Sequence, residues 1–321
     1  MLSKEKEFLE HILSNLSTGC LRLNPVIFLV FIIALAQTVA AQPLIVPLKA
    51  NTKIFQPGEQ IIIGFNGKRE IIVIRQYLKS THYTEAIRII PFPSEVAFRL
   101  DDISLFSRLR KLTDKKKLSF ERVSRQTRKQ RKGRRYQFFI SDRYLCRPSG
   151  IVESKISKLD ELAHYIKSSL RDTNKNEKHS LLTESQVSLF KTYLEKNFNY
   201  FYFDEIKIRP KTRGILPVRF SFDTDKLYCP FSLAQFFFRS GDIKVYVIYK
   251  EGSIDPHCLS WTDDSGPFSN DSHLSREEVN NIDHELASLF KKGKIKIKLM
   301  RFVGQLNSLS SDLFCGGDET S

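Results

Sequence analysis

The sequence predicts an α+β fold, with largely antiparallel sheets and several packed amphipathic helices after an N-terminal signal peptide. Three observations lead to this prediction. Strand-like segments rich in Ile, Val and Phe come in runs, amphipathic helical patterns interrupt those runs, and no internal repeat is visible. Hydrophobic residues make up 41% of the 321 residues, which supplies a sizeable core and excludes a disordered chain.

The pattern of residues 1–41 is that of a signal peptide. Residues 26–36 form an unbroken apolar run, and the small residues Val39 and Ala41 predict cleavage after Ala41. The run is shorter than the ~20 apolar residues of a membrane span, so an uncleaved signal-anchor is the alternative. Residues 1–20 carry three acids and only two lysines, and we expect that translation begins after them, at position 21.

The first part of the predicted domain, residues 42–314, consists of strands. Residues 60–65 and 69–75 flank Asn66-Gly67, which predicts a hairpin because Asn-Gly tolerates positive φ at both central turn positions. A third strand over 85–90 is expected to stop at the prolines that follow, since proline cannot donate to a ladder.

Helices and strands alternate irregularly over the rest of the domain. Helices are expected after Asp101-Asp102, over 156–170, and after the capping box Thr183-Glu-Ser-Gln186. A further continuous helix is expected to follow the capping box at Ser275 and to carry Val279, Ile282, Leu286 and Leu289 on one face. Strands are expected at 136–140, 200–203, 205–208, 217–222, 243–248 and 294–299, and the tail 315–321 is expected to be disordered.

Positive charge is concentrated in residues 108–135, the basic segment. It contains fourteen Lys/Arg against Asp114 and Glu121, and thus holds +12 of the formal net charge of +15. Such a density attracts phosphate or sulfate polymers, anionic lipid headgroups and acidic cell-wall polymers. The alternative is a solvated insertion with no dedicated partner. The residues predicted to bind a polyanion are Arg122, Arg125, Arg128, Lys129, Arg131, Lys132, Arg134 and Arg135.

Four cysteines follow the signal peptide, at Cys146, Cys229, Cys258 and Cys315, and none forms a CxxC pair. They allow three pairings, so one or two disulfides are expected in an oxidising compartment. Four unpaired buried thiols are the alternative.

Catalytic and metal-binding patterns are not found. The sequence has no phosphate-binding Gly loop, no Gly-x-Ser-x-Gly and no His-Glu-x-x-His. His257 and Cys258 are neighbours, but adjacent side chains of an extended segment point apart, so a solvated histidine beside a half-cystine is favoured. The pair Asp263-Asp264 lacks the spaced third acid of a calcium loop. The sequence therefore predicts no catalytic residue, no metal ligand and no cofactor.

Several motifs follow one another in a fixed order between residues 55 and 313. They are Phe55-Gln-Pro-Gly-Glu-Gln60, Gly64-Phe-Asn-Gly67, Ile89-Ile-Pro-Phe-Pro-Ser94, Asn197-Phe-Asn-Tyr-Phe-Tyr-Phe-Asp204, Pro217-Val-Arg-Phe-Ser-Phe-Asp-Thr-Asp225, Leu227-Tyr-Cys-Pro230 and Ile282-Asp-His-Glu-Leu-Ala-Ser-Leu-Phe290. Together they resemble an exported bacterial and archaeal family, domain-of-unknown-function family 2330. The resemblance implies export and brings no reaction, ligand or catalytic residue with it. Phe65 and Cys229 depart from the Trp and Tyr usual in the family, which argues against Cys229 as a family nucleophile, and the basic segment is not a family feature.

These observations favour an exported protein of the periplasm, cell envelope or extracellular space, which stays membrane-anchored if the signal is not cleaved. Its predicted function is a non-enzymatic binding or structural module whose basic loop contacts an anionic polymer or membrane surface. The alternative is a hydrolase-like enzyme with its site near the loop 251–272, which holds the single Trp261. A cytoplasmic nucleic-acid binder is least favoured, because it requires the apolar run 26–36 to be a core helix. No small-molecule partner is predicted, and the sequence leaves the oligomeric state open.

Overall fold

The computed structural model describes residues 44–49, 51–118, 120–123, 145–168, 182–231, 236–237, 240–259, 271–306, 309 and 312–316. All of them belong to the second of two units, Val39–Ser321. The predicted signal peptide, the strand expected at 136–140 and residues 119 and 124–135 of the basic segment lie outside these residues. Among the described residues, no helix is both long enough and apolar enough to cross a membrane.

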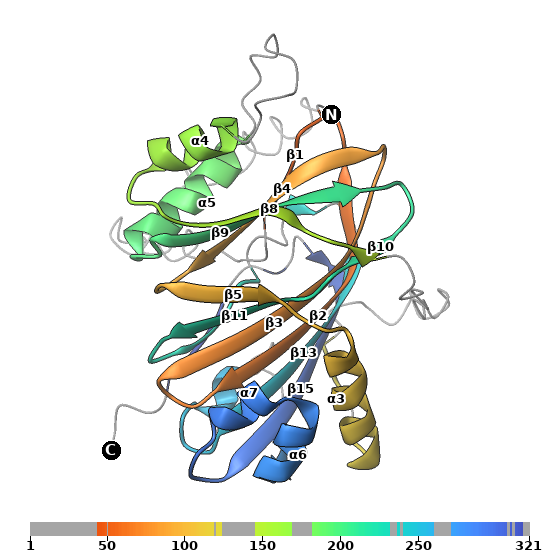
Figure 1. Ribbon diagram of the computed structural model, residues 1–321, viewed down its shortest axis with the longest axis vertical. Coiled ribbons are helices and arrows are strands. Elements are labelled where there is room, and N and C mark those ends of the chain that lie inside the picture. The colour runs from red at the N-terminus through yellow and green to blue at the C-terminus, as the bar shows by residue number, and fades with distance from the viewer. Residues whose placement is uncertain are drawn as a thin grey trace, which may run out of the picture. The chain divides into compact units, whose positions relative to one another are not determined.

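Two large sheets and one small sheet form the described part of the chain (Figure 1). The ten-stranded sheet has the order β14-β15-β13-β2-β3-β10-β7, with β11 beside β3, β5 beside β11, and β6 beside β15. Its strands are β2 (Ile54–Phe65), β3 (Arg69–Ser80), β5 (Val96–Leu100), β6 (Glu121–Val123), β7 (Leu145–Cys146), β10 (Arg213–Ile215), β11 (Val218–Asp223), β13 (Ser240–Lys250), β14 (Ser272–Leu274) and β15 (Ile295–Gln305).

The four-stranded sheet has the order β1-β4-β9-β8, and a two-stranded sheet pairs β12 with β16. These strands are β1 (Leu44–Pro47), β4 (Thr84–Phe92), β8 (Ser149–Lys155), β9 (Tyr200–Ile208), β12 (Leu227–Cys229) and β16 (Leu313–Cys315). Most described ladders are antiparallel; the pairs β13–β2, β10–β7 and β15–β6 are parallel. The predicted class of largely antiparallel sheet combined with helix therefore holds at this coarse level, with strand more abundant than helix.

The predicted hairpin is confirmed, but its turn lies one residue further along the chain. β2 and β3 pair antiparallel with Phe65 opposite Glu70, and the Asn66 N–H donates to the Arg69 carbonyl. The centre of the turn is therefore Gly67-Lys68, and only Gly67 has positive φ, at 94°. The Asn66 side chain accepts from the N–H groups of Lys68 and Arg69, each at 2.9 Å, which fixes the turn without positive φ at Asn66.

The third predicted strand is longer than expected. β4 passes through Pro91, which pairs with Phe201 of β9, and ends at Phe92. The β1 ladder reaches only as far as Ile89, so no strand on that side requires an N–H from Pro91. The two strands expected over 200–208 are one continuous strand, β9.

The ten-stranded sheet is covered on both faces, and alternating side chains belong to two cores. Ile61 and Ile63 join the first core, which includes residues of the four-stranded sheet. Ile62 joins the second core, under the helices α3 (Ser104–Lys115), α6 (Arg276–Ile282) and α7 (His284–Ser288) (Figure 1). The helices α4 (Leu159–Ser168) and α5 (Glu184–Glu195) contribute to the first core, and α5 begins with the predicted capping box at Thr183.

The single helix expected over 275–289 is two helices. α6 begins at the predicted capping box of Ser275, but Asp283 is extended, with φ −162° and ψ 127°, and α7 starts after it. The Asp283 carboxylate accepts from the Leu286 N–H at 2.8 Å and binds the Arg219 guanidinium. A buried arginine from β11 thus stabilises a helix break that the hydrophobic periodicity alone does not reveal.

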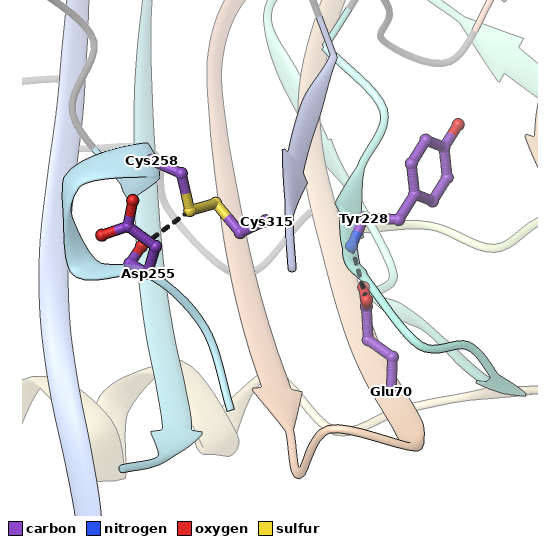
Figure 2. The surroundings of a disulfide bond; sticks show 5 residues. All are labelled: Glu70, Tyr228, Asp255, Cys258 and Cys315. Carbon is purple, nitrogen blue, oxygen red and sulfur yellow. Dashed lines mark hydrogen bonds between the residues drawn. A yellow bond between two sulfur atoms is a disulfide. The ribbon is translucent and has the colours of Figure 1, made fainter. Parts of the chain in front are cut away.

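The C-terminal strand is anchored from two sides, which corrects the tail boundary expected at residue 315. Cys315 is buried in β16, pairs with Leu227 of β12, and forms a disulfide with Cys258 of the short helix η3 (Pro256–Leu259) (Figure 2). On the far side of β16, the Tyr228 N–H donates to the buried Glu70 carboxylate at 2.7 Å. Residues 315 and 316 therefore belong to the folded domain.

Candidate anion-binding face

A row of basic side chains crosses the ten-stranded sheet on the face that carries α3. Arg301 of β15 is in register with Lys244 of β13, Lys244 with Gln60 of β2, and Gln60 with Arg75 of β3. These residues lie two positions before or after members of the second core, such as Tyr246 and Ile62, and so share their face. We call Arg75, Lys244 and Arg301, together with Gln60, the cation row.

The cation row borders acidic and aromatic groups. Asp242 accepts from Nε and Nη2 of Arg301, at 2.8 and 2.7 Å, a fork-to-fork pairing. The Arg75 guanidinium lies 5.0 Å from the centre of the Tyr77 ring, and Tyr77 O–H donates to Gln60 Oε1 at 3.4 Å. The row is thus built from rigid sheet positions and not from a loop.

The described parts of the basic segment lie against this row. The Lys244 ammonium is 5.8 Å from the centre of the Phe120 ring, which packs edge-on against Tyr246 with centroids 5.2 Å apart. The parallel pairing of β6 with β15 then places the Arg122 backbone in register with Arg301. The segment therefore leaves α3, crosses Lys244 at Phe120, and runs along β15 beside the row.

Lys244 differs from Arg301 in the direction in which its surroundings shift its pKa. Burial lowers the pKa of its half-buried ammonium, and the neighbouring charges of Arg301 and Arg110 lower it further, while Asp242 acts in the opposite direction. Among the residues that the structure describes, no carboxylate lies within ion-pair distance of Lys244. Within the described part of the chain, Lys244 therefore feels the charge of Asp242 but has no direct ion pair.

Not all of the basic segment is available for binding. Arg108 Nε donates to the Ile282 carbonyl at 2.7 Å, and Lys116 Nζ lies 2.9 Å from Glu278. These two cations attach α3 to α6, so they serve the fold. Of the predicted polyanion-binding residues only the Arg122 backbone is described; Arg125, Arg128, Lys129, Arg131, Lys132, Arg134 and Arg135 lie outside the described residues.

Sequence reasoning did not find the part of the face that the strands supply. Arg75, Lys244 and Arg301 are separated by up to 226 positions, and each is one of several cations spread along a largely apolar strand. The only local signal was a charged residue inside the apolar pattern of residues 243–248, which alternation explains without any ligand.

The cysteines have different fates. Cys258 and Cys315 form a disulfide, one of the pairings that the sequence left open, and Cys258 is thus a half-cystine beside His257. Cys229 is a free thiol with 0% exposure, and burial raises its pKa, with the nearby acids Glu70 and Glu59 acting in the same direction. It is therefore held as a neutral core residue and is not an activated nucleophile. For Cys146 only the backbone is described, in β7.

Two buried acids lie in the first core, on the opposite face of the sheet. Glu59 accepts from Gln56, Gln56 accepts from Gln76, and Gln76 accepts from Arg88, each within 3.2 Å. Arg88 binds Asp204, whose carboxylate also accepts from Tyr202 O–H at 2.6 Å. Burial raises the pKa of Glu59 to about 8, and burial also raises that of Glu70. Every member of this network is at most 1% exposed, so it links the two large sheets and offers no access to a substrate.

Other polar groups have structural partners. Arg219, 1% exposed, binds Asp101 at 2.7 Å, Asp283 at 2.7 Å and Glu285 at 2.9 Å. The Asp101 carboxylate expected to cap α3 is thus turned toward Arg219, while Asp102 accepts from the Ser104 N–H at the start of that helix. Within the described part of the chain, no group of three His, Cys, Asp or Glu residues could hold a metal ion.

A shallow groove of about 600 Å³ lies between β8 and α4. Ser154, Lys155, Ile156, Asp160, Glu161 and His164 line it. The Glu161 carboxylate is occupied by the N–H groups of Ser157 and Lys158, so it caps α4. Most of the loop 251–272, including Trp261, Asp263 and Asp264, lies outside the described residues, and the hydrolase alternative stays a prediction.

Comparisons with known proteins add little. No family model matches the chain, and no curated protein matches it. Among solved structures, the crystal structure of a mutated baculovirus P35 after caspase cleavage is similar at 10% identity and a TM-score of 0.36, covering 81% of this chain and 99% of that chain. A likeness this weak carries no argument about fold or function. The resemblance to domain-of-unknown-function family 2330 stays a prediction.

Proposed function

We propose that this protein is an exported, non-enzymatic module of the cell envelope whose basic segment binds an anionic polymer beside the cation row. One observation carries the proposal: Phe120 and β6, both within the basic segment, lie against Lys244 and Arg301. The basic segment, in which the positive charge of the sequence is concentrated, therefore lies beside the cation row, whose residues come from strands far apart in the sequence.

Electrostatics explains why this arrangement favours a polymer. A mobile or extended basic stretch binds polyanions through counterion release, with little demand on geometry. A row of cations fixed on strands adds a defined place at which the polymer meets the folded surface. Cross-strand neighbours lie about 5 Å apart, so Lys244 and Arg301 are closely spaced, while the buried Arg75 lies beyond Gln60 and supports the row from within the sheet.

Export is supported by the apolar run at 26–36 and by the Cys258–Cys315 disulfide. Structural disulfides persist in oxidising compartments and are rare in the cytosol. An envelope location would bring the basic face to anionic cell-wall polymers, which fits the charge of residues 108–135.

The proposal is tested by measuring affinity for heparin and for polyphosphate over a range of salt concentrations. For the parent protein, we expect the logarithm of affinity to fall linearly with the logarithm of salt concentration, because bound cations displace counterions. A variant with six cations of the segment changed to serine should lose this binding and keep its melting temperature. The six positions are Arg128, Lys129, Arg131, Lys132, Arg134 and Arg135.

A charge-matched control separates the segment from net charge. It changes six exposed lysines from other parts of the surface to serine, and should retain most of the affinity. These are Lys68, Lys191, Lys196, Lys211, Lys291 and Lys292. Equal loss in both variants would contradict a dedicated site. A parent that binds neither polymer would identify the segment as a solvated insertion, and binding only to anionic vesicles would point to a membrane surface.

A further inference from the structure

We propose that Lys244 anchors a discrete subsite for one tetrahedral oxyanion, phosphate or sulfate, carried by the polymer that the basic segment attracts. The inference rests on the proposed function and adds to it a defined chemical group and a defined position. It concerns the face of β13 between β15 and β2.

The donors at this position come from different elements. Lys244 is flanked in register by Arg301 on one strand and by Gln60 on the other. The Gln60 carbonyl oxygen accepts from Tyr77, which leaves its amide N–H groups as donors beside Lys244. Arg110 of α3 lowers the pKa of Lys244, but its exposed guanidinium lies 3.7 Å from Asp114, so it is not counted among the donors.

The neighbouring acid, Asp242, favours the charged form of Lys244 but forms its ion pair with Arg301. Asp242 uses both carboxylate oxygens on Arg301, at 2.8 and 2.7 Å. Lys244 instead has an aromatic neighbour, the Phe120 ring at 5.8 Å, which gives a weak attraction to the cation. Among the described residues, an incoming anion would therefore be the first counter-charge in direct contact with Lys244.

The charge of Lys244 is not explained by folding. A half-buried ammonium near two arginines costs desolvation and repulsion, and an apolar side chain at the same place would avoid both. On the same face, the adjacent inward positions are apolar, including Tyr246 and Ile62. The charge of Lys244 therefore lowers the stability of the fold but would stabilise a bound anion.

A tetrahedral oxyanion fits these donors better than a carboxylate does. Lys244 and Gln60 donate from neighbouring strands about 5 Å apart, so their donors reach a ligand from two separate backbone positions. Phosphate and sulfate present several oxygens in different directions, whereas a carboxylate presents two in a plane.

The test uses the mature protein with sodium phosphate and sodium sulfate at constant ionic strength. Calorimetric titration measures affinity, and thermal melting measures stability with and without each anion. The parent should bind at least one anion and melt at a higher temperature in its presence. K244M should bind at least ~10-fold more weakly and, without anion, melt no lower than the parent, since an apolar side chain replaces a desolvated charge.

The control is K291M, which removes an exposed lysine from the loop after α7 and should bind as the parent does. The phosphate and sulfate arms decide which oxyanion the subsite prefers. If K244M binds as tightly as the parent, or the parent binds neither anion, the subsite is refuted. If polymer binding is retained in that case, the proposed function still holds without the subsite. If the serine variant of the basic segment loses polymer binding but still binds the anion, the anion subsite is formed by the strands alone.

Discussion

At the scale of single residues, the burial of Glu59 has the clearest consequence. Its carboxyl lies in a network whose one arginine, Arg88, is already matched by Asp204. An ionised Glu59 would add an uncompensated negative charge to a core without solvent, which is why burial raises its pKa to about 8. Near neutral pH this side chain is therefore mostly protonated in the folded protein.

This raised pKa predicts how stability depends on pH. The unfolded chain releases the proton near the ordinary glutamate pKa of 4.5, whereas the folded chain keeps it up to a pKa of about 8, so the folded state binds more protons between these values. The free energy of unfolding should therefore fall as pH rises from 4.5 to 8. Glu59→Gln should remove this contribution and be more stable than the parent at pH 8, by a few kcal/mol, with little difference at pH 4.5.

Urea unfolding at several pH values measures this effect. Glu70, whose pKa burial also raises, contributes in the same direction, so the slope in the variant should be reduced and not abolished. Equal slopes for the parent and Glu59→Gln would show that Glu59 is ionised in the native state.

At the scale of secondary structure, the break between α6 and α7 depends on Asp283. This carboxylate caps α7 and holds Arg219 with two bonds at 2.8 and 2.7 Å, and the Arg219 side chain is only 2% exposed. Asp283→Ala should lower the free energy of unfolding by roughly 3 kcal/mol, because it leaves a buried guanidinium with weaker compensation and removes a cap.

The matched control for that variant is Glu285→Ala. Glu285 also contacts Arg219, but its side chain is 41% exposed, so the loss should stay below about 1 kcal/mol. Thermal melts of both variants make the comparison. Similar losses in the free energy of unfolding would mean that the summed negative charge around Arg219 stabilises it, and not the two hydrogen bonds to Asp283.

At the scale of the whole molecule, the disulfide connects the C-terminal strand to the body of the domain. Cys258 and Cys315 are 57 positions apart, and without the bond β16 would be held by its ladder to β12, the hydrogen bond from the Asp255 N–H to the Gly316 carbonyl, and nearby packing. Replacing both cysteines with serine should lower the free energy of unfolding by about 4 kcal/mol, the loop-closure entropy returned to the unfolded chain. Urea unfolding with and without reductant measures it.

The native protein supplies the accompanying control. Thiol titration of protein purified from its own cells should find Cys258 and Cys315 oxidised, and its N-terminal sequence should begin at Gln42. Reduced cysteines together with an intact leader would contradict export. Cys229→Ser leaves the disulfide in place and should not alter the response to reductant.

The sequence by itself determined the features that depend on local chemistry. The hairpin of β2 and β3, the capping boxes at Thr183 and Ser275, and the strand character of β9, β11, β13 and β15 were predictable, because periodicity, turn residues and caps act over a few positions. The concentration of charge in residues 108–135 was equally visible in the sequence.

The tertiary structure alone decided what depends on distant partners. The helix break at Asp283 requires Arg219 from another element, and the pairing of Cys258 with Cys315 was one of several that spacing allowed. The cation row requires four strands, β15, β13, β2 and β3, to lie in one register. Local propensity carries no information about which strands become neighbours, since that choice follows from the packing of both sheet faces into separate cores.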